Sequence, residues 1–201
     1  MPLEVRQVEK NDIADIAKMD RIVMKDVGIS NAIWRIQEAE NIDITYAFER
    51  FISNGMEHHA ETFWKVVDTE SNEMISVAKF SFQYHEGEAY QDTPVEGEEP
   101  PPKKLLEFFT ALNEKSNEFA KENFTGRPHA RTRGAAHMLL DKGTKKADEA
   151  GLDMYLQASL MGAELYKKFE FEVVSVEEID LSQWGVDKVD TRTYMKRVTR
   201  G

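Results

Sequence analysis

The sequence contains no cysteine, which excludes disulfide bonds, thiolate catalysis and metal sites built from cysteine. It has no apolar run long enough to cross a bilayer. Residues 1–20 alternate charged and apolar residues and lack the apolar block of a secretory signal peptide, so we expect a cytoplasmic protein. The sequence shows no Walker loop, Ser-His-Asp spacing or metal-binding signature, and we expect no metal site.

Basic residues are fewer than acidic ones. The 201 residues include 37 Asp and Glu against 26 Lys and Arg, which gives a formal net charge of −11. Such a chain repels nucleic acids and anionic membranes, so neither is an expected partner. Residues 121–146 are a local exception, with seven basic and two acidic residues. This basic segment indicates either a small anionic ligand or a solvated helix face.

The length and the 41% of hydrophobic residues fit one folded domain, 1–201. The apolar periodicity predicts an α+β fold. We expect strands at 3–8, 62–67, 75–82, 154–158, 171–179 and 191–198. We expect helices at 13–23, 103–123, 134–150 and 164–169, and one or two helices within 31–56. Residues 85–102 are rich in acids and proline and are predicted to form an exposed loop.

The most informative residues lie just before and at the start of the helix predicted at 134–150. They are Arg131, Thr132, Arg133, Gly134, Ala135 and Ala136. The first amides of a helix have no partner within it, and the helix dipole favours an anion there. Small residues at 134 and 136 let a phosphate approach the backbone, and two arginines add positive charge. Taken alone, the segment fits a pyrophosphate site or an ordinary helix start.

These residues resemble the acyl-CoA signature of the GNAT superfamily of N-acetyltransferases. That signature has Gln or Arg, two variable residues, Gly, one variable residue, and then Gly or Ala. Arg131, Gly134 and Ala136 occupy its fixed positions. Residues 154–158 and the later segment 165–169, Leu-Tyr-Lys-Lys-Phe, resemble the segments after the signature in fungal-type members. The resemblance covers about residues 127–200, and the N-terminal half resembles the family only in the order of its elements.

The resemblance implies a mixed, mostly antiparallel central sheet flanked by helices, with acetyl-CoA as co-substrate and a small amine as acceptor. The amine would attack the thioester carbonyl directly while both substrates are bound. Tyr166 would protonate the departing thiolate. Without the resemblance, Tyr166 fits a core aromatic residue of a short helix. His85 and Glu86 would lie on the acceptor side, and Gln157 stands where relatives often have Glu.

The sequence departs from the family pattern before the glycine motif. Members have an apolar, alternating strand there, whose backbone binds the pantetheine arm and polarises the thioester. Here Phe124 is the only large apolar residue between Ala120 and Met138, so we predict that this fourth strand is deleted. Either residues 124–130 replace it or a second chain does, by strand exchange in a homodimer; otherwise the sheet splits.

Glu170 is a further departure, because it replaces the Gly usual between two phenylalanines. If this position requires a positive φ, Glu is strained there. The departures leave three functions open. The first is acetyl transfer to a small amine. The second is a GNAT-like domain that binds a ligand or a partner without transfer. The third is another reaction in the same cleft, such as cyclisation or hydrolysis.

Overall fold

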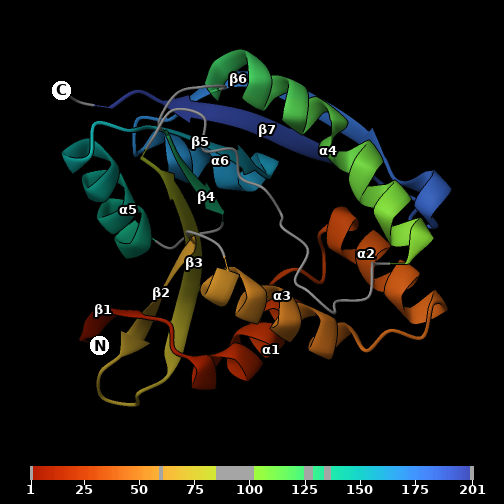
Figure 1. The fold of residues 1–201 in the computed structure, drawn as a ribbon, viewed down its shortest axis with the longest axis horizontal. Helices are drawn as coiled ribbons and strands as arrows, with labels where there is room; N and C mark the ends of the chain where they lie inside the picture. The colour runs from red at the N-terminus through yellow and green to blue at the C-terminus, as the bar shows by residue number, and fades with distance from the viewer. Residues whose placement is uncertain (1, 59–60, 85–101, 125–128, 134–136, 200–201) are drawn as a thin grey trace.

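A computed structural model describes residues 2–58, 61–84, 102–124, 129–133 and 137–199. Within these residues, seven strands form one sheet in the order β1-β2-β3-β4-β5-β7-β6 (Figure 1). They are β1 (Leu3–Gln7), β2 (Glu61–Asp68), β3 (Met74–Gln83), β4 (His129–Arg133), β5 (Asp153–Ala158), β6 (Glu172–Asp180) and β7 (Val189–Arg197). Neighbouring strands are antiparallel, except that β4 and β5 are parallel. The predicted mixed, mostly antiparallel sheet is therefore confirmed.

Helices cover both faces of the sheet (Figure 1). One face carries α5 (His137–Glu149) and α6 (Leu160–Lys167). The other carries α1 (Ile13–Val23), α2 (Gly28–Ala39), α3 (Ile44–His58) and α4 (Lys103–Phe124). Two short 3-10 helices, η1 (Lys10–Asp12) and η2 (Ser182–Trp184), complete the described elements. None of the described helices is long and apolar enough to cross a membrane.

The region 31–56 holds parts of two helices, α2 and α3, which was one of the two predicted possibilities. Asn41 lies between them with a φ of 55°. Asparagine tolerates this left-handed conformation, which ends a helix because the chain can no longer continue the helical path. The two helices can therefore leave the same segment in different directions.

The larger core lies between the sheet and the helices α5 and α6. Alternate side chains of the strands point into it, which is the pattern that a half-buried strand requires. The strand residues in this core are Trp64, Val66, Ala78, Phe80, Phe82, Met154, Leu156, Ala158 and Met195. Arg197 of β7 ties the end of α5 to the sheet, because its guanidinium donates to both carboxylate oxygens of Asp148 at 2.7 Å.

Helix α4 crosses the opposite face of the sheet. It lies between β3 and β4 in the sequence, although these strands are antiparallel neighbours. Its N-terminal half packs against α2 and η2 through Leu105, Phe108 and Leu112. Its C-terminal half reaches β5 and β7, where Phe119 contacts Tyr155 and Tyr194. The buried Arg192 of β7 also donates to the backbone oxygen of Leu112 at 2.8 Å.

The prediction that the fourth strand is deleted is wrong. The strand β4 lies between β3 and β5, and it pairs with five residues of β3 and three of β5. A strand within a sheet is held by backbone hydrogen bonds, so it does not need apolar alternation when its neighbours supply partners. The five residues His129–Arg133 form this strand, so the sheet does not split and no second chain is needed to complete it.

Candidate functional site

The parallel strands β4 and β5 separate at their carboxyl ends. Their register consists of His129 with Asp153, Ala130 with Met154, and Arg131 with Tyr155. Beyond these pairs β4 continues to Arg133 and β5 to Ala158 without pairing with each other. We call residues 132–133 and 156–158 the fork. Within the fork each strand turns one backbone edge toward the gap, and such an edge can hydrogen-bond an extended ligand.

Both strands of the fork lead toward helices. Residues 134–136 separate β4 from α5, and Ser159 alone separates β5 from α6. The Ser159 hydroxyl caps α6 by accepting a hydrogen bond from the Gly162 backbone nitrogen at 3.2 Å. Because β4 and β5 are parallel, both helices begin at the same edge of the sheet, beside the fork. Free amides and the helix dipole at such an edge favour anionic groups.

Tyr166 lies on α6 and is 6% exposed. Its ring meets Phe171 edge-on, with 5.8 Å between the ring centroids. It belongs to the same buried cluster as Leu156 and Ala158, which are residues of the fork. The structure therefore places Tyr166 on the α5 and α6 face of the sheet, on the helix that begins at the end of the fork. This position fits both roles that the sequence left open, the general acid and the core aromatic residue.

The residues predicted to bind acetyl-CoA do not form one loop. Arg131, Thr132 and Arg133 are the C-terminal part of β4, where they pair with Ser81, Phe80 and Lys79 of β3. The sequence predicts only that these three residues precede a helix, and the structure adds that they form a strand, because β3 supplies a backbone partner for each of them. The small residues of the motif, Gly134, Ala135 and Ala136, lie outside the described residues. The role of all six in binding acetyl-CoA stays a prediction.

Of the three residues predicted on the acceptor side, the structure describes one. Gln157 is part of the fork, is partly exposed, and pairs with Tyr194 of β7. Strand alternation places it with Tyr155 on the face opposite to Tyr166. His85 and Glu86 lie outside the described residues. Their role and that of Gln157 stay predictions.

A buried polar group beside Gln157 was not foreseen. Tyr194 is 2% exposed, and its hydroxyl donates to Oε2 of Glu177 at 2.7 Å. Burial, and then the hydrogen bond with Glu177, raises the pKa of Tyr194 to about 12, against a smaller opposing effect of Arg192. Tyr194 is therefore a hydrogen-bond donor at neutral pH. The alternation of apolar and polar residues in 191–198 predicts strand β7. No sequence pattern predicts the register of β6 and β7, which brings Tyr194 and Glu177 together.

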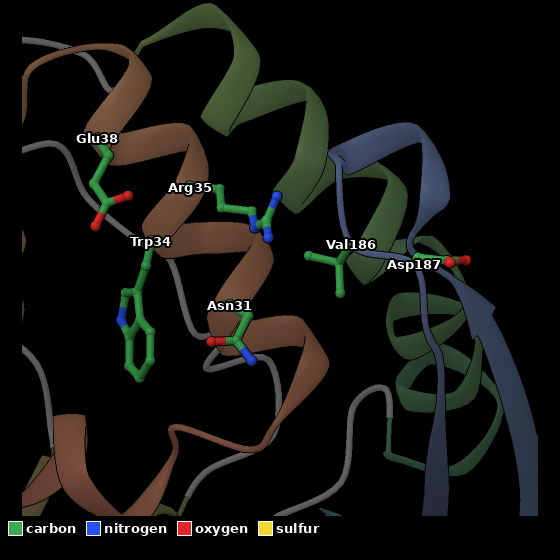
Figure 2. A pocket seen from close by; sticks show the side chains of 6 residues that line it. All are labelled: Asn31, Trp34, Arg35, Glu38, Val186 and Asp187. Atoms are coloured by element: carbon green, nitrogen blue, oxygen red, sulfur yellow. The ribbon is translucent and has the colours of Figure 1, made fainter.

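A surface hollow of about 360 Å³ lies between α2 and the turn before β7. Figure 2 shows its lining residues, which are Asn31, Trp34, Arg35, Glu38, Val186 and Asp187. Arg35 bridges the two elements, because its Nη1 donates to the backbone oxygen of Gly185 at 2.7 Å. None of the described residues that line the hollow belongs to the fork or to the predicted site residues. We therefore assign the candidate site to the fork.

Solved structures share this architecture over the whole chain. Arylalkylamine N-acetyltransferase 2 from Aedes aegypti superposes with a TM-score of 0.64 at 12% identity, covering 100% of both chains. A GNAT-family acetyltransferase from Streptococcus pneumoniae gives a TM-score of 0.54 at 11% identity, covering 99% of this chain and 100% of that one. The chain has the GNAT fold.

A third similar structure is not named an acetyltransferase. The C-terminal condensation domain of Ebony, in complex with beta-alanyl-dopamine, gives a TM-score of 0.61 at 10% identity over 99% of this chain and 100% of that domain. At such identities the likeness establishes the fold alone. The sequence matches no family model and no curated protein. The fungal-type subtype stays a prediction.

Proposed function

We propose that the protein is an acetyl-CoA-dependent N-acetyltransferase that acts on a small amine. The fork is the observation that carries this proposal. It combines two parallel strands that separate with two helices that begin at the same edge. Open strand edges suit the amide groups of a peptide-like arm, and helix starts suit phosphates. Acetyl-CoA has both kinds of group and a thioester at the end of the arm.

The fork and the residues beside it would bind different parts of acetyl-CoA. Residues 131–136 lead into α5 and would hold the pyrophosphate, with Arg131 and Arg133 supplying positive charge. The facing edges of β4 and β5 would pair with the arm. A backbone N–H of the fork that points at the thioester carbonyl would stabilise the negative charge that develops on its oxygen during attack.

Transfer needs one new bond, one broken bond and two proton movements. The nitrogen of a neutral amine forms a bond to the carbonyl carbon, and the bond from that carbon to sulfur breaks. Tyr166 would give its proton to the sulfur as the thiolate leaves. The amine must lose a proton, and His85 or Glu86 is our candidate for accepting it. Gln157 cannot serve as this base at neutral pH, but its amide can orient the amine.

Binding of acetyl-CoA gives the first test. A ligand present at 100 times its dissociation constant stabilises a protein by about 2.7 kcal/mol, which is a shift of several degrees for a chain of this size. We expect this shift with acetyl-CoA, and release of free thiol when a small primary amine is added. ATP is the matched control, because it carries phosphates and adenosine without the arm. The absence of any shift at millimolar acetyl-CoA would refute the proposal.

The second candidate function is ligand binding or another reaction in the same fork, such as cyclisation or hydrolysis. The structural likeness to the condensation domain of Ebony keeps this candidate open, since that protein has the same fold and is not named an acetyltransferase. Two results together would favour it. One is stabilisation by acetyl-CoA that survives Tyr166→Phe, and the other is no thiol release with any amine tested.

A further inference from the structure

Helix α4 is connected to both strands of the fork. Residues 125–128 separate its end at Phe124 from β4. Between one and two turns before that end, Phe119 packs against Tyr155 of β5, with 6.3 Å between the ring centroids. Tyr155 is the residue at which β5 leaves β4, because its pair with Arg131 is the last of the parallel register. One helix therefore continues into the first strand and packs on the second.

The contact between Phe119 and Tyr155 is enclosed. The side chains of Phe119 and Tyr155 are each 7% exposed. Tyr194 is 2% exposed and lies against Phe119, with 5.0 Å between the centroids. Leu156, the next residue of β5, points to the other face and is buried with α5 and Tyr166. At the point where the fork opens, β5 is thus held from both faces, and α4 supplies the support on one of them.

The rest of α4 is fixed independently of the fork. Phe108 is 1% exposed and meets Trp184 of η2 edge-on at 5.1 Å. The guanidinium of Arg192 bonds the backbone oxygen of Leu112, so β7 also holds the middle of the helix. A helix held at several points along its length moves little as a body. Its side chain at 119 is therefore a fixed point against which Tyr155 rests.

We propose that Phe119 is a positioning residue, which acts through Tyr155 to set the separation of β4 and β5 at the fork. The consequence for catalysis rests on the proposed function. Acyl transfer is sensitive to misplacement of the reacting groups by about 1 Å, which costs on the order of a hundredfold in rate. A smaller side chain at 119 lets Tyr155 shift and changes the separation of the strands. The start of α5, which would hold the phosphates, has its own packing through Leu139 and Leu140.

Phe119→Leu tests this role, and Phe108→Leu is its matched control. Both residues are buried phenylalanines of α4, and both changes remove the same atoms. We expect both variants to lose thermal stability. Only Phe119→Leu should lower kcat by about tenfold or more, and its Kd for acetyl-CoA should rise by a smaller factor, because the phosphates would still bind at the start of α5. If Phe119→Leu does not fold, Phe119→Met replaces it, because methionine is similar in volume to leucine but its flexible, unbranched side chain adapts better to an irregular site.

Amide hydrogen exchange gives a readout that does not depend on activity. We expect Phe119→Leu to raise the exchange rates of residues 131–133 and 155–157 above those of Phe108→Leu. Equal kcat and equal exchange in the two variants would overturn the inference. If the wild-type protein neither binds acetyl-CoA nor releases thiol, the proposed function fails. The exchange comparison then still decides whether Phe119 controls the fork.

Discussion

The ring of Phe80 in β3 fills the space where a side chain on Gly143 of α5 would have to lie. Both residues are fully or nearly fully buried at the centre of the larger core. The glycine thus lets the helix approach the sheet closely.

We expect Gly143→Ala to lower the free energy of unfolding by about 1–2 kcal/mol. The overlap with Phe80 costs about 1–3 kcal/mol in a packed core, and the better helix propensity of alanine returns up to about 1 kcal/mol. Urea unfolding measures the difference. Lys145→Ala, at an exposed position of the same helix, serves as the control and should change stability by less than about 0.5 kcal/mol. A more stable Gly143→Ala variant would show that the helix can move away from β3.

Glu170 occupies the left-handed region with a φ of 67°, as the replacement of a usual glycine suggested. Its carboxylate lies 3.9 Å from Nη2 of Arg197, and so long an ion pair offsets little of the backbone strain. Glu170→Gly should therefore raise the free energy of unfolding by about 1 kcal/mol. Glu172→Gly in the neighbouring strand β6 should lower it, because glycine weakens an ordinary strand. A loss of stability in Glu170→Gly would mean that the contact with Arg197 outweighs the strain.

Tyr166→Phe keeps the ring that packs against Phe171 and removes the hydroxyl. If Tyr166 is the general acid, kcat should fall by about 10²–10⁴ while the Kd for acetyl-CoA stays the same. An acetyl thioester whose thiol is more acidic should recover most of the rate, because its thiolate leaves without a proton. Tyr46→Phe, at an exposed position of α3, is the control. Unchanged kcat in Tyr166→Phe would leave only the packing role.

The raised pKa of Tyr194 predicts a loss of stability in alkali. The folded chain keeps this proton up to about pH 12, whereas an unfolded tyrosine loses it near pH 10. Deprotonation therefore favours the unfolded chain in this window. The contribution is fully present below pH 10 and is lost as the pH rises toward 12. Urea unfolding at pH 8, 10 and 11 should show a steeper decline for the wild type than for Tyr194→Phe. Parallel declines would contradict the assignment.

Elements with clear apolar periodicity were predictable. The spacing of apolar residues indicates α5, β3 and the other elements that bury one face, because burial of that face is what stabilises them. Local backbone requirements were predictable too. Gly151 directly follows the helix predicted at 134–150, where a glycine commonly ends a helix, and it has a φ of 68°. In such cases the sequence pattern and the local backbone structure depend on the same few neighbouring residues.

Features that depend on distant partners were not predictable. The five residues of β4 carry no apolar alternation, and their strand exists because β3 and β5 both offer backbone partners. The path of α4 across the opposite face depends on where β5 and β7 lie. The bond between Tyr194 and Glu177 depends on the register of β6 and β7. Periodicity within one segment contains no information about any of these.

The place of β4 in the chain also has a consequence for the order of folding. On one side of it lie β1, β2 and β3, and on the other lie β5, β7 and β6. Strand β4 can pair with β3 only after residues 84–128 have closed a long loop. Closing this loop lowers the chain entropy before any stabilising contact between the two strands has formed. We expect the two sets of strands to form first and β4 to join them last. The fork would then not exist in a half-folded chain. Recovery of acetyl-CoA binding during refolding would lag behind recovery of helical structure. It would report that β4 has paired with both sets of strands.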